Sequence, residues 1–376
     1  MLPSRPLCAA RPRVGSLGVS MALVATLSFA PAAHAHRKSH APMDSARAAE
    51  LYVSDRFSDL PQGNFAKERA ARLAAESIYV ARSAGVMRFR IVHYKSRADG
   101  LEIPAYLFTP PESRGRHGYA AMVWVHGGVH GFWDEKMLPF VIDAVRHHYV
   151  IIAPQYRGSG GYGKDFADAI DYGGREVSDV VSAADYLRTL PYVDPARMGI
   201  MGWSHGAYIT TLALFRHQTD FKAGAAIVPV TNLLFRLSLK GPKYQKSFAA
   251  ESTIAGLPFE KVQEYLDRSP FYLVDSLETP IMVHVATNDS TVNFVEDEQI
   301  IDALRARKPN LAETRVYVDP APGYTGFGHT FSRRVNLKTL EREDSPAQRD
   351  SWNRTWTFFD WYLRPYEDPS IRNVDP

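Results

Sequence analysis

Short apolar runs recur between residues 120 and 318, and turn-forming residues bound each of them. A short run of this kind, rich in apolar and β-branched residues, predicts a buried strand. The stretch 207–217 predicts a helix instead. The runs that we expect to form strands cover residues 120–125, 149–153, 197–201, 281–285 and 315–318.

The pentapeptide 202–206 has the sequence Gly-Trp-Ser-His-Gly and lies between the strand predicted over 197–201 and the helix predicted over 207–217. A Gly-x-Ser-x-Gly motif in a strand–turn–helix context is typical of a nucleophile elbow. Both glycines are needed because a Cβ at either position would collide with neighbouring backbone in so tight a turn. We therefore predict that Ser204 is a nucleophile with an exposed Oγ.

An acid and a histidine follow Ser204 in the chain order that this chemistry requires. Asp289 comes after the strand predicted over 281–285, at the strand end where such folds place their sites. His329 comes after the strand predicted over 315–318, at the end of a glycine-rich loop with flexible glycines. We assign His329 as general base and then acid, and Asp289 as the carboxylate that orients it.

Asp289 and His329 each have a structural alternative. Asn-Asp-Ser is ordinary turn chemistry, so Asp289 alone could be a turn residue. His329 alone could be a loop histidine. Their order after Ser204, with each at the end of a strand, favours the catalytic interpretation.

An oxyanion hole is predicted after the strand over 120–125, where His126, Gly127 and Gly128 follow. A loop of this kind supplies a backbone N–H to the developing oxyanion, and the residue after the nucleophile supplies another. We predict Gly127 or Gly128 together with the N–H of His205. The His205 side chain is expected to line the pocket rather than act as base, and His126 is expected to be structural.

The order of these motifs predicts an α/β-hydrolase, with a mostly parallel central sheet and helices on both faces. Residues 90–376 are expected to form the catalytic domain, with a helical insertion over about 231–269 between two core strands. Residues 36–89 are expected to form an N-terminal helical extension. That extension either caps the domain or shapes the entrance to the site.

The chain resembles the catalytic domain of the prolyl oligopeptidase family of serine peptidases, which includes acylaminoacyl-peptidases and dipeptidyl-peptidases. The resemblance implies a peptidase that acts through an acyl-enzyme on short peptides. We expect Trp203 and Tyr156 to belong to the substrate pocket. The blocks that carry the resemblance, in the family's order, are residues 95–107, 125–128, 156–163, 179–187, 193–197, 269–270 and 328–331.

The sequence departs from that family in two ways. Too few residues precede Lys95 for the β-propeller that family members often carry, so size selection by a propeller is not expected. The elbow has His205 where the family usually has an aromatic residue. We therefore expect the substrate to be a short peptide or an ester. An ester or lactone hydrolase and a non-catalytic binding module remain alternatives to a peptidase.

Residues 1–35 predict a signal peptide, because basic residues precede an apolar run over 16–30 and a small-x-small cleavage site at Ala35. The alternative is an uncleaved anchor, although the run is short for a membrane span. We expect cleavage, and hence export to the periplasm or the medium with no stable membrane span. The single cysteine, Cys8, lies in this leader and would be lost with it.

Composition is that of an ordinary globular enzyme, with 45% hydrophobic and 23% charged residues. Of 44 basic residues, three arginines lie in the predicted leader, so the remaining chain matches the 41 acidic residues. This balance gives no indication of a nucleic-acid surface, and we expect no metal and no cofactor. Four basic residues of the insertion are expected to form a solvated face: Arg236, Lys240, Lys243 and Lys246.

Overall fold

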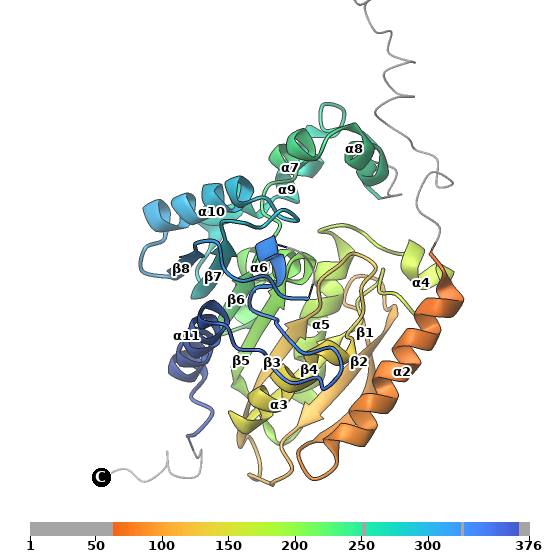
Figure 1. The fold of residues 1–376 in the computed structure, drawn as a ribbon, viewed down its shortest axis with the longest axis vertical. Helices are drawn as coiled ribbons and strands as arrows, with labels where there is room; N and C mark the ends of the chain where they lie inside the picture. Colours follow the sequence, from red (N-terminus) through yellow and green to blue (C-terminus); the bar gives the residue numbers. More distant parts are fainter. Residues whose placement is uncertain (1–62, 250–252, 325–326, 368–376) are drawn as a thin grey trace, which may run out of the picture. The chain divides into compact units, whose positions relative to one another are not determined.

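The computed structural model describes residues 63–249, 253–324 and 327–367. They form an eight-stranded sheet with the strand order β1-β2-β4-β3-β5-β6-β7-β8 (Figure 1). β1 and β2 run antiparallel to their neighbours and all other neighbouring pairs are parallel. The strands are β1 (Arg88–Lys95), β2 (Glu102–Thr109), β3 (Tyr119–Val125), β4 (Tyr149–Pro154), β5 (Val193–Trp203), β6 (Ala223–Ile227), β7 (Ile281–Ala286) and β8 (Ala312–Tyr317).

Helices cover both faces of this sheet, which confirms the predicted fold class. One apolar core lies between the sheet and α5, α6 and α10, and a second lies between the sheet and α2, α3 and α11. Every residue of β3 and β4 is buried, which explains their unbroken apolar sequences. The helices are α2 (Phe65–Ser83), α3 (Leu138–Arg146), α5 (Arg175–Thr189), α6 (His205–Arg216), α10 (Phe294–Arg307) and α11 (Pro346–Leu363).

The chain between β6 and β7 forms three further helices, α7 (Leu233–Lys240), α8 (Pro242–Ala249) and α9 (Val262–Asp267). Here the expectation of a solvated basic face is wrong for Arg236, which is buried. Its Nη1 lies 3.1 Å from Glu296 Oε2, and its Nε donates to the Tyr244 hydroxyl. Lys240 is partly buried, and its Nζ donates to Ser290 O at 3.0 Å. The side chains of Lys243 and Lys246 lie outside the described part of the structure.

Helix α2 belongs to the predicted N-terminal extension. The Asn64 side chain caps it by accepting a hydrogen bond from the Lys67 N–H, and Tyr79 packs into the second core. The predicted signal peptide and the rest of the extension up to residue 62 lie outside the described residues. Among the helices of the described segments, none combines the length and apolar character needed to cross a membrane.

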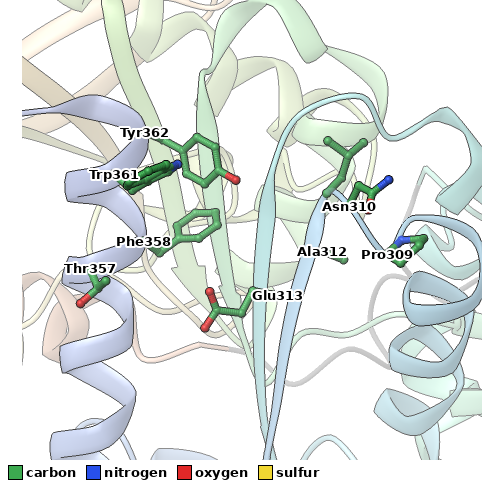
Figure 2. Close-up of a pocket in the computed structure, with 9 residues that line it drawn as sticks. Pro309, Asn310, Ala312, Glu313, Thr357, Phe358, Trp361 and Tyr362 are labelled. Atoms are coloured by element: carbon green, nitrogen blue, oxygen red, sulfur yellow. The ribbon is translucent and has the colours of Figure 1, made fainter.

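A hollow of about 290 Å³ lies at the β8 edge of the sheet, between β8 and α11. Figure 2 shows Phe358, Trp361 and Tyr362 of α11 on one side of it and Glu313 of β8 on the other. Trp361 is 75% exposed. None of the predicted site residues lines this hollow.

The remaining short elements are α4 (Lys164–Asp168) and the 3-10 turns η2 (Glu135–Met137), η3 (Gln218–Asp220), η4 (Pro270–Ser276) and η5 (Phe327–Thr330).

Candidate active site

Ser204 occupies the turn between β5 and α6, as the motif predicts. Its backbone has φ 55° and ψ −121°, a conformation that is strained for any residue with a Cβ. The Ser204 N–H donates to Ile227 O at 3.0 Å, and Tyr208 N–H donates to Ser204 O at 2.9 Å. The flanking strand and helix therefore hold the strained turn in place.

The two elbow glycines are required by close backbone contacts. A Cβ on Gly202 would lie 2.4 Å from the carbonyl carbon of Gly206. A Cβ on Gly206 would lie 2.3 Å from Val125 O at the end of β3. Both distances are too short for real atoms, so the turn and its contact with β3 exclude any larger residue.

The structure brings Asp289 and His329 together. His329 Nδ1 donates to Asp289 Oδ2 at 2.7 Å, and both residues are buried. Asp289 Oδ1 accepts from the backbone N–H groups of Thr291 and Val292 at 2.8 and 3.0 Å, which fixes the carboxylate. Because Nδ1 carries the proton in this bond, Nε2 of neutral His329 is a proton acceptor.

Burial sets the charge of His329. It lowers the pKa of the imidazole below the usual value of 6.5, against the opposing effect of the Asp289 hydrogen bond. Positive charges on Arg333 and Arg236 lower that pKa further. His329 is therefore neutral at pH 7 and available as a base.

Gly328 is needed for contact rather than for flexibility. Its N–H donates to Asn288 O at 3.0 Å, which joins the loop of His329 to the loop of Asp289. A Cβ at this position would lie 2.1 Å from Asn288 Oδ1 and 2.7 Å from the Ala286 side chain. The absence of a side chain therefore allows the two loops to approach within hydrogen-bond distance of each other.

A cleft of about 370 Å³ contains Ser204 and His329 in its lining. This volume is within the range of small-molecule sites. Trp203 lines the cleft, as expected of a pocket residue, and its indole stacks on Trp124 with ring centres 5.4 Å apart. Gly127, Gly128 and Tyr324 also line it.

The loop predicted to form the oxyanion hole lies against the nucleophile. A Cβ on Gly127 would be 2.9 Å from Trp203 O and 3.3 Å from Ser204 Cβ. Gly128 has φ 77°, which suits glycine. His126 is buried, and its Nε2 lies 2.9 Å from Ser159 Oγ, as expected of a structural histidine, but it also lines the cleft.

Tyr156 does not line the cleft, contrary to expectation. Its ring is fully buried and stacks on His126 at 4.3 Å. Its hydroxyl donates to Gly128 O at 2.8 Å. Tyr156 therefore stabilises the loop of Gly127 and Gly128 through packing and a hydrogen bond within the core.

The His205 side chain is also absent from the cleft, so the expectation that it lines the pocket is wrong. It is buried beside Tyr172 and Glu176, and its Nε2 lies 2.9 Å from Glu176 Oε1. Burial lowers the pKa of His205 to about 3 and raises that of Glu176 well above its usual value. The His205 backbone N–H remains suitable for an oxyanion, because His205 is the first residue of α6.

Three charged residues that were not predicted from the sequence also line the cleft: Glu68 of α2, Asp134 and Arg333. Arg333 could have been noticed, because a cation four residues after a candidate base lies near it in space. Glu68 gives no such signal, since nothing in the sequence indicates how α2 packs. In the described segments, no group of His, Cys, Asp and Glu side chains could hold a metal ion.

Comparison with protein families matches residues 140–339 to the prolyl oligopeptidase family. The match covers more than half of the chain and includes Ser204, Asp289 and His329. The chain belongs to the prolyl oligopeptidase family. This confirms the resemblance that the sequence blocks indicate.

Two curated relatives are similar to part of this chain. The uncharacterized peptidase YuxL of Bacillus subtilis is 28% identical over 211 residues, which cover 55% of this chain and 31% of that protein. The acylamino-acid-releasing enzyme of Mus musculus is 25% identical over 217 residues, covering 55% of this chain and 29% of that protein. The chain thus spans roughly a third of the length of these relatives.

A solved acylaminoacyl peptidase of Pyrococcus horikoshii has the same fold. It superposes with a TM-score of 0.60 at 22% identity, over 77% of this chain and 44% of that one. A likeness at this level of identity concerns the fold alone. It agrees with the sheet order and helix layers of the α/β-hydrolase described above.

Proposed function

We propose that this protein is a serine-type peptidase that cleaves peptide or acyl-amide bonds through an acyl-enzyme. The observation that carries the proposal is the hydrogen bond between His329 and Asp289 in a cleft that also contains the strained Ser204. Membership of the prolyl oligopeptidase family supports it. In this proposal Ser204 is the nucleophile, His329 the base and Asp289 the orienting carboxylate.

The proposed reaction begins when His329 Nε2 takes the proton of Ser204 Oγ as that oxygen attacks the carbonyl carbon. The carbonyl oxygen becomes an oxyanion, which accepts hydrogen bonds from the N–H of Gly127 or Gly128 and of His205. His329 then gives its proton to the leaving nitrogen, and the C–N bond breaks. Water, deprotonated by His329, releases the acyl group from Ser204 and restores both residues.

Peptide bonds are preferred over esters in this proposal because the relatives are named as peptidases. The experiment compares aminoacyl p-nitroanilides with p-nitrophenyl esters of the same acyl groups. We expect the anilides to be cleaved, with a loss of about a thousandfold or more in Ser204→Ala. Ser77→Ala, an exposed position on α2, is the matched control and should keep full activity.

Each other outcome points to one alternative. Turnover of the esters alone would replace the peptidase with an ester hydrolase. A folded protein that turns over neither substrate would contradict catalysis and favour a binding module on this fold.

We also propose that the protein is exported after cleavage of residues 1–35. The proposal rests on the basic, apolar and small-residue segments of that leader. N-terminal sequencing of the protein secreted from its native host should find a chain that begins at His36. Recovery of the intact N-terminus in the membrane fraction would instead indicate an uncleaved anchor.

A further inference from the structure

Arg333 is a buried cation in the proposed active-site cleft without a counter-ion in the described part of the chain. Its side chain is only 8% exposed, yet its Nε has no hydrogen-bond partner and its guanidinium forms no ion pair with a described carboxylate. Burying a charge is costly unless an opposite charge or several hydrogen bonds compensate it. An arginine that lines a cleft and has no carboxylate in ion-pair contact among the described residues is therefore a suitable partner for an anionic group of a ligand.

The position of Arg333 is fixed by its surroundings. The guanidinium lies over the ring of Trp203, with 5.2 Å between its Cζ and the ring centre, and 5.7 Å from the Tyr324 ring. The preceding residue, Ser332, accepts the Trp203 indole N–H at its hydroxyl and the Trp352 indole N–H at its carbonyl, both at 2.9 Å. Arg333 is thus held in place before any ligand arrives, which reduces the entropy cost of binding.

The two acidic residues that line the cleft form no ion pair with Arg333, although its charge acts on Asp134 and opposes the rise that burial causes in the pKa of that carboxyl. Asp134 forms an ion pair with Lys136. Glu68 lies beside the loop after β4, where its Oε2 would be 3.5 Å from a Cβ on Gly160. Neither carboxylate is in ion-pair contact with Arg333.

A second arginine on the same aromatic cluster shows what a compensated guanidinium looks like here. Arg342 lies over Phe140 and Trp352, much as Arg333 lies over Trp203. Its guanidinium, however, donates to Asp143 at 2.6 Å and to Asp344 at 2.9 Å. Arg342 therefore combines stacking on aromatic rings with carboxylate partners, whereas no described carboxylate pairs with Arg333.

We propose that Arg333 binds a carboxylate group of the substrate beside the bond that Ser204 attacks. This inference rests on the proposed function, and it specifies the substrate class: short peptides with a carboxylate close to the scissile bond. Arg333 packs on Trp203, the residue before the nucleophile, so the bound carboxylate lies near the reacting carbonyl. The planar guanidinium suits two parallel hydrogen bonds to a carboxylate. That carboxylate is either the C-terminus of a short peptide or an acidic side chain.

Two substrate pairs distinguish these sources. The first pair is a tripeptide with a free C-terminal carboxylate and the same tripeptide with a C-terminal amide. The second pair is a dipeptide p-nitroanilide with Glu before the scissile bond and its Gln counterpart. For each pair the measured quantity is the ratio of kcat/KM between the acid and its amide.

We expect a ratio of about tenfold or more in one of the pairs for the unmodified enzyme, since a charge-assisted hydrogen bond is worth that much. In Arg333→Met the ratio should fall to about one, because methionine keeps the packing on Trp203 and loses the charge. In Arg342→Met, the matched control, the ratio should be unchanged. A ratio near one in both pairs for the unmodified enzyme, or an unchanged ratio in Arg333→Met, overturns the proposal.

Failure of the proposed function is distinguishable from failure of this inference. If no substrate is turned over, equilibrium binding of the same peptides to Ser204→Ala, followed by tryptophan fluorescence, decides the inference alone. Tighter binding of the acid than of the amide, lost in the Ser204→Ala/Arg333→Met double variant, supports carboxylate binding. Equal binding of acid and amide contradicts it.

Discussion

The loop that follows β4 and the loop that follows His329 each contain a buried arginine. The two arginines differ in whether they have carboxylate partners. Arg157, in the first loop, is 1% exposed and donates to both oxygens of Asp179 at 2.8 Å. It also donates to both oxygens of Asp99, at 2.8 and 2.9 Å. Arg333, in the second loop, is almost as buried and has no carboxylate partner among the described residues.

This difference separates an arginine that holds the fold together from one that is available to a ligand. Arg157 joins the loop after β4 to α5 through Asp179, and its hydrogen bonds lower the pKa of Asp99 to about 2. All three nitrogens of its guanidinium donate to a carboxylate of the protein. Arg333 forms no ion pair with any described carboxylate, so its charge is available for recognition of a ligand.

The largest expected effect concerns stability at Arg157. Arg157→Met leaves the fully buried Asp179 without its partner, which should cost about 3–5 kcal/mol in the free energy of unfolding. Arg333→Met should change the free energy of unfolding by about 1 kcal/mol or less, because methionine keeps the packing on Trp203 and only the cation–π attraction is lost. Urea denaturation of the two variants measures both values. A larger loss of stability in Arg333→Met than in Arg157→Met would contradict the proposed difference between the two arginines.

Gly328→Ala tests how closely the two catalytic loops must approach. The added Cβ would collide with Asn288 and Ala286 and should push His329 away from Asp289. A displacement of about 1 Å costs roughly a hundredfold in kcat/KM, while Arg157 and its partners are untouched. Steady-state kinetics on a peptide anilide would measure this loss. Activity within a factor of about two of the unmodified enzyme would show that the loops tolerate separation.

The pH dependence of activity tests a second consequence of the unpaired charge, because the positive charge of Arg333 lowers the pKa of His329. Activity requires neutral His329, so kcat/KM should rise with pH through the pKa of this residue and then level off. Burial lowers that pKa, so the midpoint should lie below the usual 6.5. Removing the positive charge in Arg333→Met should move the midpoint upward.

An uncharged amide substrate is needed for this measurement, so that substrate binding itself does not depend on Arg333. Arg342→Met serves as control and should leave the midpoint where it is. A midpoint above 6.5 in the unmodified enzyme, or a downward movement in Arg333→Met, would disagree with the assigned role of His329.

Glu176 is a buried ionisable group whose charge is avoided by protonation. Its replacement is expected to have the smallest effect on stability. Burial raises the pKa of Glu176 well above its usual value, so the folded protein keeps this carboxyl protonated. Stability contributed in this way is present at low pH and is lost as pH rises through the raised pKa. Glu176→Gln should therefore change stability by less than about 1 kcal/mol in acid and become relatively more stable in alkali. Denaturation curves at both pH values measure the difference, and a large loss in acid would contradict a protonated Glu176.

The positions of Ser204, Asp289 and His329 at strand ends could be predicted from the sequence, because they depend on local signals. The same holds for β3, β4, β5, β7 and β8, whereas β1, β2 and β6 are not among the predicted strands. Apolar runs mark β3 and β7, and the spacing of glycines marks the elbow. A short tight turn and a strand end are defined by a few consecutive residues. Such features can be recognised without knowledge of the tertiary structure.

The side chains of His205 and Tyr156 could not be placed in that way. Each lies beside a catalytic motif in the chain, but its direction depends on packing against residues far away in sequence. The His205 side chain packs against Tyr172 and lies beside Glu176, and the Tyr156 hydroxyl donates a hydrogen bond to the carbonyl oxygen of Gly128. Their proximity to the motifs along the chain therefore predicted that both side chains line the pocket, whereas tertiary packing buries them in the core.

Arg236 and Arg333 show the same limit for charge. The sequence favours a solvated face at Arg236, yet Glu296 of α10 lies close enough to pair with it in the interior. At Arg333 no partner is present in the described residues. Composition gives the number of charges, whereas only the fold determines which of them are compensated.

The central claim is that Ser204 is the nucleophile of a serine hydrolase. Its most direct test is reaction of the folded protein with a fluorophosphonate, followed by mass spectrometry of the modified peptide. The account predicts a single phosphonylated residue, Ser204, and no labelling of Ser204→Ala. Labelling at another serine, or no labelling of a protein shown to be folded, would contradict it.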